Sequence, residues 1–167
     1  MISSILAVGQ NGEIGYQGEL PWRGMFAEDK EYYLQHTYRN IRVGARGSVN
    51  SFEHSRLCYL VSSKPSPKPD YCEDIFDYNK FTPLDILSTI QKNHPLLNVY
   101  VVGGVPWYHA SAPYVDKIYL TRFDESFEHD RKVDLNILLD NKKLENSVQG
   151  KDKRITFETW VPNLIKL

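Results

Sequence analysis

Short apolar runs alternate with segments of helical pattern along this chain, and the alternation limits the possible folds more than any other sequence feature. The runs are rich in β-branched and aromatic residues, and several are apolar almost throughout, as in strands buried on both faces. The predicted strands span residues 2–8, 40–44, 57–62, 98–102 and 115–122. Helices are predicted over residues 27–37, 83–93 and 105–112. This order predicts an α/β fold with a mostly parallel central sheet and helices on both faces.

The helix at residues 83–93 has the clearest signals. Thr82 can cap its first turn, and Pro83 suits the first helical position because its missing N–H costs nothing there. Apolar residues then recur along one side of the helix, at Ile86, Leu87 and Ile90. The chain ends differently, with two alternating segments at 144–148 and 154–161 around the polar turn 149–153, which predicts a C-terminal antiparallel hairpin.

Length and charge bound the class of protein. A chain of 167 residues fits one domain, so a single domain over residues 1–167 is expected. The net charge is −1 with both signs interspersed, which gives no support for a nucleic-acid or anionic-membrane partner. No run reaches the 18 or so apolar residues of a membrane span, and the N-terminus lacks the pattern of a signal peptide. We therefore expect a cytoplasmic monomer that acts on small molecules.

The two cysteines do not have the spacing of a metal site. Cys58 lies inside an apolar run, and Cys72 follows the proline-rich segment 64–70. Two reduced thiols are favoured, with a disulfide or a redox role as the alternative. The five histidines are scattered, and no cysteine–histidine ligand spacing occurs, so no metal is expected.

Three predicted strands end in residues that can hold a phosphate. VGARGS at 43–48 brings an arginine fork and a predicted helix start, and LVSSK at 60–64 brings two hydroxyls and a lysine. In VVGGVPWYHA, residues 101–110, Gly103 and Gly104 allow a ligand to approach the backbone closely. Each segment alone is as well explained by a surface turn, and no GxGxxG motif is present. Together they favour a dinucleotide, because ligands of such sheets bind at the carboxyl ends of the strands.

A candidate acid lies at the start of the first helix. Glu28 and Asp29 follow the LPW segment at 20–22, and Asp29 shares one helix face with Tyr33 and Thr37. Acids at a helix N-terminus can simply favour the helix dipole. A carboxylate turned inward beside aromatic rings would instead recognise a nitrogen heterocycle.

Further motifs combine with these segments. NGEIGYQGELPW at 11–22 carries Ile14–Gly15 and Leu20–Pro21–Trp22, VVGGVPWY fits the pattern V-I-G-G-x-x-x-Y, and IYLTR at 118–122 contains a strand threonine. MISSILAV and TFE fit the first and last strands of the same pattern. In this order the motifs resemble the dihydrofolate reductase family over nearly the whole chain. The resemblance implies a single dihydrofolate-reductase-like domain and the NADPH-dependent reduction of 7,8-dihydrofolate to 5,6,7,8-tetrahydrofolate.

The resemblance also implies roles for individual residues. Asp29 would bind the pterin, Trp22 would order a water beside it, and Thr121 would hold Asp29 by a hydrogen bond. The implied catalytic residues are Asp29, Trp22, Thr121, Leu20 and Tyr108. The implied substrate contacts are Ile5, Ala7, Asp29, Tyr33, Arg56, Val102 and Thr121. The implied NADPH contacts are Ala7, Ile14, Gly15, Arg46, Gly47, Ser48, Ser62, Ser63, Lys64, Gly103, Gly104, Val105, Pro106, Trp107 and Tyr108. A cis peptide between Gly103 and Gly104 is implied as well.

The chain departs from the family pattern in at least three places. Two extra residues separate Trp22 from the helix, so Glu28 is an alternative to Asp29 as the active-site acid. The segments 44–48 and 49–55 lack residues that bind the cofactor phosphate and the glutamate tail of the substrate in the family. A related NADPH-dependent reductase of another pterin or a pyrimidine, or a non-catalytic binding module, are therefore alternative functions.

Overall fold

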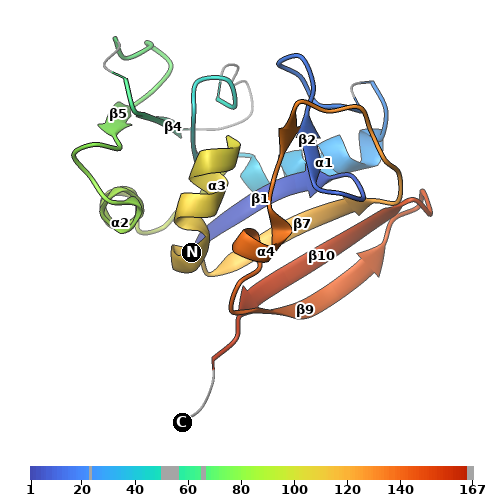
Figure 1. The fold of residues 1–167 in the computed structure, drawn as a ribbon. Helices are drawn as coiled ribbons and strands as arrows, with labels where there is room; N and C mark the ends of the chain where they lie inside the picture. Colours follow the sequence, from blue (N-terminus) through green and yellow to red (C-terminus); the bar gives the residue numbers. More distant parts are fainter. Residues whose placement is uncertain (23, 50–56, 65–66, 165–167) are drawn as a thin grey trace.

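An eight-stranded sheet forms the centre of the protein, with the order β5-β4-β3-β6-β1-β7-β10-β9. The structure is a computed structural model that describes residues 1–22, 24–49, 57–64 and 67–164 (Figure 1). The strands of this sheet are β1 (Ile2–Val8), β3 (Ile41–Gly44), β4 (Leu57–Ser62), β5 (Asp74–Asp77), β6 (Val99–Val101), β7 (Lys117–Phe123), β9 (Lys142–Gln149) and β10 (Ile155–Pro162). A second, two-stranded sheet pairs β2 (Glu13–Gly15) with β8 (Arg131–Lys132).

The central sheet is parallel from β5 to β7 and antiparallel at its C-terminal end. β1 lies between β6 and β7 and is parallel to both. β10 then runs antiparallel to β7, and β9 antiparallel to β10, with a register shift at Thr159 and Trp160. The predicted mostly parallel sheet with a closing hairpin is confirmed.

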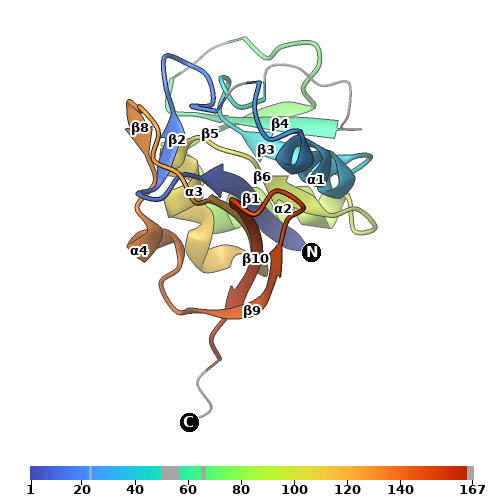
Figure 2. The ribbon, with the colours of Figure 1, turned by 90° about the vertical axis from the view of Figure 1, so that its right-hand side faces the viewer.

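Helices cover both faces of this sheet. The helices are α1 (Ala27–Thr37), α2 (Pro83–Asn93), α3 (Val105–Ser111), α4 (Leu135–Leu138) and the 3₁₀ turn η1 (Ala112–Tyr114). α2, α3 and α4 bury their apolar residues in one core, whereas Tyr33 of α1 packs on the other face with Ile5, Tyr100 and Val102. Figures 1 and 2 show α1 and α3 on opposite sides of β1. No helix in the described part of the chain is long and apolar enough to cross a membrane.

The helix at 83–93 forms as its signals predict. The Thr82 hydroxyl accepts a hydrogen bond from the Asp85 N–H at 3.1 Å, and the side chains of Ile86, Leu87 and Ile90 are fully buried. A cap of this kind stabilises a helix by about 1 kcal/mol.

Two details of the secondary structure differ from the prediction. β2, β5, β8 and α4 were not expected because they are short or polar, and residues 46–48 form a turn within the described residues instead of opening a helix.

Candidate active site

The three strand ends with phosphate-capable residues lie next to one another. β4, β3 and β6 are neighbours in the sheet, and all three are parallel. Parallel strands bring their carboxyl ends to one edge, so the segments after Ser62, Gly44 and Val101 share that edge (Figure 1). β1 and β7 continue the same edge, where Ala7 pairs with Thr121.

Glycines shape the junction between two of these ends. The Ala45 N–H donates to the Gly103 carbonyl at 2.9 Å, and the Gly103–Gly104 peptide is cis, as expected. A side chain at Gly44 would place its Cβ 2.6 Å from the Gly103 oxygen. At Gly103, with φ +122°, a Cβ would lie 2.6 Å from Ser48 Oγ. The backbone is therefore packed more closely here than side chains would allow.

The β4 end forms a hydroxyl- and lysine-bearing turn beside an arginine. Ser62 Oγ accepts from the Lys64 N–H at 3.1 Å and donates to the Lys64 carbonyl at 3.0 Å. Arg46 Nη2 donates to the Pro67 carbonyl at 2.8 Å, which holds the arginine against the segment that follows. Arg46, Ser63 and Lys64 are exposed, so this corner presents cations and hydroxyls to solvent.

Asp29 is the half-buried acid of this edge. It lies in the first turn of α1 and is hydrogen-bonded to Thr121, whose side chain is 1% exposed in β7. Burial raises the pKa of Asp29 from 3.8 to about 6, and the Thr121 hydrogen bond opposes part of that rise. A carboxyl group that titrates near neutral pH can exchange a proton with a ligand or with water.

Aromatic and apolar side chains surround this acid. The Tyr108 hydroxyl donates to the Ile5 carbonyl at 2.8 Å. Burial raises the pKa of Tyr108 well above its ordinary value, and the nearby Tyr33 and Asp29 add to the rise. Ile5 and Val102 are buried and belong to the cluster against which Tyr33 packs. The predicted substrate-binding residues Ile5, Tyr33 and Val102 therefore lie together in space.

The segment that contains Trp22 is tied to residues 123–130. The Trp22 ring packs edge-on against Phe123 and Phe127, with centroids 4.6 and 5.4 Å apart. Asp130 donates its N–H to the Gly15 carbonyl at 2.9 Å and accepts from the Gln17 N–H at 2.8 Å. Leu20, expected to line the pocket, is 53% exposed.

Glu13 is a buried residue that sequence reasoning did not single out. Its side chain is 0% exposed and accepts hydrogen bonds from the backbone N–H groups of Asn11 and Phe127, the latter at 2.9 Å. It therefore fastens the 11–22 segment to the 123–130 segment. A lone glutamate in a polar loop carries no signal of burial, because its partner lies 114 residues away.

Glu28 points to a different part of the molecule from Asp29. Its carboxylate accepts from the Lys151 N–H at 2.9 Å and the Asp152 N–H at 3.2 Å, in the turn between β9 and β10. Gly150 leaves the space for it, since a Cβ there would lie 2.9 Å from Glu28 Oε1. Glu28 therefore fixes the hairpin to α1, and Asp29 is the acid that contacts Thr121.

Replacing Glu28 with alanine should lower the free energy of unfolding by about 1–2 kcal/mol, because two backbone N–H groups lose a charged acceptor. Urea unfolding at pH 7 measures the change. Glu28→Gln, which keeps an acceptor oxygen, should lose less. Equal losses for the two variants would contradict the hydrogen-bonding role.

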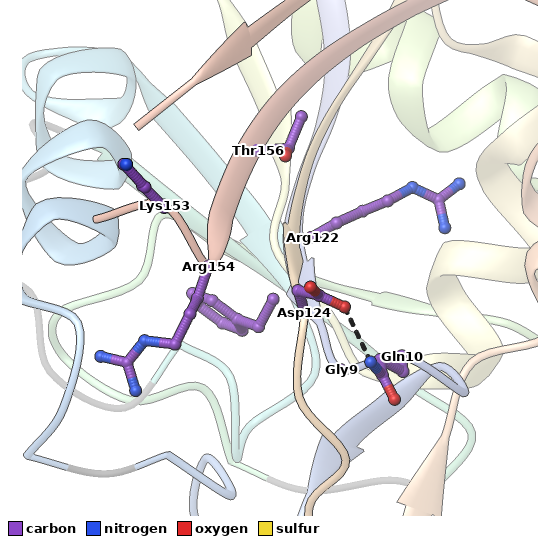
Figure 3. A pocket seen from close by; sticks show the side chains of 8 residues that line it. Gly9, Gln10, Arg122, Asp124, Lys153, Arg154 and Thr156 are labelled. Atoms are coloured by element: carbon purple, nitrogen blue, oxygen red, sulfur yellow. Dashed lines mark hydrogen bonds between the residues drawn. The ribbon is translucent and has the colours of Figure 1, made fainter. Parts of the chain in front are cut away.

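A separate cavity of about 330 Å³ opens at the ends of β1, β7 and β10 (Figure 3). Its lining residues are Gly9, Gln10, Arg122, Phe123, Asp124, Lys153, Arg154 and Thr156. Figure 3 shows the side chains of Arg122, Lys153 and Arg154 pointing in different directions. Arg122 Nε pairs with Glu158 at 2.6 Å, and Arg154 Nη2 pairs with Asp152 at 2.7 Å. The two arginines are paired with carboxylates and the three cations diverge, so this cavity does not gather positive charge, and the acid-bearing edge is the candidate site.

The last points concern Arg56 and a metal site. Arg56, expected at the substrate tail, lies outside the described residues. Among the residues that the structure does describe, no group of three or more histidine, cysteine, aspartate or glutamate side chains is arranged to hold a metal ion.

The fold and the site define a class of α/β proteins in which a half-buried carboxylate and a glycine-lined junction share the carboxyl edge of one sheet. Residues 1–160 match the sequence model of the family described as dihydrofolate reductase. The chain belongs to the dihydrofolate reductase family.

Several known proteins are similar to this chain. Dihydrofolate reductase type 9 of Escherichia coli is 24% identical over 98% of this chain and 95% of its own length. Dihydrofolate reductase of Bacillus subtilis is 28% identical over 95% and 90%, respectively. Dihydromethanopterin reductase of Methylorubrum extorquens is 23% identical over 80% and 90%. A solved structure of dihydrofolate reductase from Enterococcus faecalis complexed with NADP(H) and RAB-propyl has the same fold, with a TM-score of 0.76 over 98% of this chain and 97% of that one at 20% identity.

Proposed function

We propose that this protein reduces 7,8-dihydrofolate to 5,6,7,8-tetrahydrofolate with NADPH. The observation that carries the proposal is the half-buried Asp29, held by Thr121 at the same sheet edge as the glycine junction and the Arg46–Lys64 corner. Membership of the dihydrofolate reductase family supports the reaction class, and the Enterococcus faecalis relative in complex with NADP(H) supports the cofactor.

The residues present fit a dinucleotide phosphate. Among the described residues nothing lies within 4 Å of a Cβ built at Gly47, and at Gly104 the nearest atom would be Pro106 Cδ at 4.0 Å, so a ligand can reach the main chain closely at these two glycines. Arg46, Ser62, Ser63 and Lys64 form the corner proposed to select the 2′-phosphate, because an arginine fork and a lysine favour a dianion. Tyr108 is proposed to lie near the nicotinamide.

NADPH, when bound, supplies the hydride that C6 of the pterin accepts. Asp29 binds the amidine-like edge of the pterin and keeps the ring oriented for that transfer. Its pKa of about 6 lets it share a proton with the bound ring, which favours protonation of N5 from solvent. Thr121 holds the carboxyl group in place, and the 11–22 segment excludes water from the site.

Gly103→Ala should weaken NADPH binding about tenfold. The new methyl group would meet Ser48 Oγ at 2.6 Å, and φ +122° is a strained conformation for alanine. Titration of the nicotinamide fluorescence gives the dissociation constant. Adding Ser48→Gly should recover the steric part of the loss, and unchanged binding in Gly103→Ala would show that the ligand does not use this junction.

A related reductase acting on another pterin is the second candidate, favoured by the similarity to dihydromethanopterin reductase. Loss of NADPH absorbance at 340 nm should be followed with dihydrofolate, with a dihydropterin that lacks the glutamate tail, and with no acceptor. We expect the highest kcat/KM with dihydrofolate. A higher value for the tail-less pterin would favour the second candidate, and NADPH binding without oxidation of any acceptor would favour a binding module.

A further inference from the structure

The two cysteines of the chain meet in the core although neither belongs to the proposed active site. Cys58 is the second residue of β4, and Cys72, 14 positions later, lies just before β5. The Glu73 N–H donates to the Cys58 carbonyl at 2.8 Å, which aligns the two segments. Cys58 is 1% exposed and Cys72 is 2% exposed, and both thiols are free.

The two sulfur atoms are already close to bonding distance. Sγ of Cys58 and Sγ of Cys72 are 2.7 Å apart, within about 0.7 Å of the bonded separation of about 2.05 Å. Cys58 lies in β4 and Cys72 lies just before β5, and these two strands are paired. A small adjustment of the side chains therefore brings the two sulfur atoms together without moving the sheet. Nearby thiols on rigid, neighbouring segments are favourable for a disulfide.

The surroundings distinguish the two thiols. Burial raises the pKa of both thiols. At Cys58 one nearby cation, Arg42, acts against the rise, whereas at Cys72 the hydrogen bond with Cys58 and two nearby cations, Lys68 and Arg46, act against it. Lys68 Nζ also donates to the Cys72 carbonyl at 2.8 Å, which keeps its positive charge beside this residue. Cys58 Sγ instead lies 3.4 Å from the Tyr71 carbonyl. Positive charge favours a thiolate, so Cys72 is the better nucleophile.

We propose that Cys58 and Cys72 form an intramolecular disulfide when a low-molecular-weight disulfide such as oxidised glutathione reaches the folded protein during local opening of the segment that carries Cys72, with Cys72 reacting first. Both thiols are reduced in the resting state. The site is a modification site separate from catalysis.

The reaction balances as two thiol–disulfide exchanges. Cys72 loses its proton to solvent, and its thiolate attacks one sulfur of the glutathione disulfide and expels a glutathione thiolate. The Cys58 thiolate then attacks Sγ of Cys72 in the mixed disulfide and expels the second glutathione thiolate. Two electrons pass from the protein to the oxidant, and the two thiolates released take up the two protons lost by the cysteines.

The new bond would close a ring around the turn that follows β4. Ser62 and Lys64 lie within this ring, and Arg46 binds the Pro67 carbonyl in the same segment. A covalent link reduces the freedom of the unfolded chain, so the oxidised protein should unfold at a higher temperature than the reduced one.

The test is thiol counting on the native protein. Protein incubated with oxidised glutathione is quenched in acid, unfolded and titrated with an aromatic disulfide reagent, and mass spectrometry identifies adducts and cross-links. Free thiols should fall from two to zero with loss of two hydrogen mass units and no retained glutathione. Dithiothreitol should restore both thiols.

Single variants test the order of attack. Cys58→Ser should accumulate one glutathione on Cys72, because the second exchange is impossible. Cys72→Ser should react at least about tenfold more slowly. Two thiols retained in the folded wild-type protein, under conditions that oxidise the urea-unfolded chain, would overturn the proposal. So would a cross-link between molecules, and faster modification of Cys72→Ser than of Cys58→Ser would overturn the assigned order.

Discussion

Asp29→Asn is expected to lower the kcat for dihydrofolate reduction at least about 100-fold. The asparagine side chain offers one acceptor and two N–H donors, where the carboxylate offers acceptors only, and it cannot carry a proton at neutral pH. It would therefore lose both the pairing with the amidine-like edge of the pterin and the help that Asp29, with its pKa of about 6, gives to protonation. A loss of this size corresponds to about 2.7 kcal/mol of transition-state stabilisation.

The neighbouring acid provides a matched control. Glu28→Gln removes one negative charge from the same turn of α1, but Glu28 contacts the turn at Lys151 and Asp152. Its kcat should stay within about twofold of the wild-type value. Stopped-flow measurement of NADPH oxidation separates the hydride step from product release. Activity retained in Asp29→Asn and lost in Glu28→Gln would assign the acid to Glu28.

The same Asp29→Asn variant should be more stable than the wild-type protein by about 1–3 kcal/mol at pH 8. The folded-state pKa of Asp29, about 6, lies above its ordinary value of 3.8, so folding makes ionisation of this group less favourable. The contribution of Asp29 to stability is therefore complete below about pH 4 and is lost as the pH rises through 6. Asparagine has no charge to bury and avoids that loss.

Chemical unfolding at several pH values checks the sign. The difference between the variant and the wild-type protein should be near zero at pH 4 and should grow up to about pH 7. All other titrating groups are shared by the two proteins, so their contributions cancel in the difference. A constant difference across the pH range, or a less stable variant at pH 8, would contradict the raised pKa of Asp29.

Strong local patterns made much of this fold predictable. β1, β4, α1 and α2 begin and end at the predicted residues. β1 and β4 are short runs of mostly apolar residues, and α2 has a capping threonine and a proline at its start. β2 and β8 were missed because three- and two-residue strands have no measurable period. Their pairing depends on contacts between segments more than 100 residues apart in the chain.

The sequence was enough to predict which kinds of residues the candidate site contains, but not which way the side chains of Glu28 and Asp29 point. The sequence left Glu28 and Asp29 as alternatives, since adjacent residues of a helix differ by about 100° around its axis and either can face the sheet. Only the packing of α1 on β7 places Asp29 against Thr121 and Glu28 against the hairpin turn. Glu13 could not be found at all, because its burial is created by the backbone of Phe127.

The hydrogen bond between Glu13 and Phe127 joins a side-chain carboxylate to a main-chain N–H. Mutations at the two positions therefore affect this hydrogen bond differently. On one side every amino acid except proline supplies the required N–H, so position 127 can change without removing the donor. At position 13, in contrast, the hydrogen bond depends on the carboxylate of the fully buried Glu13 side chain. Substitution of Phe127 can therefore alter the ring packed against Trp22 while leaving the hydrogen bond to Glu13 in place.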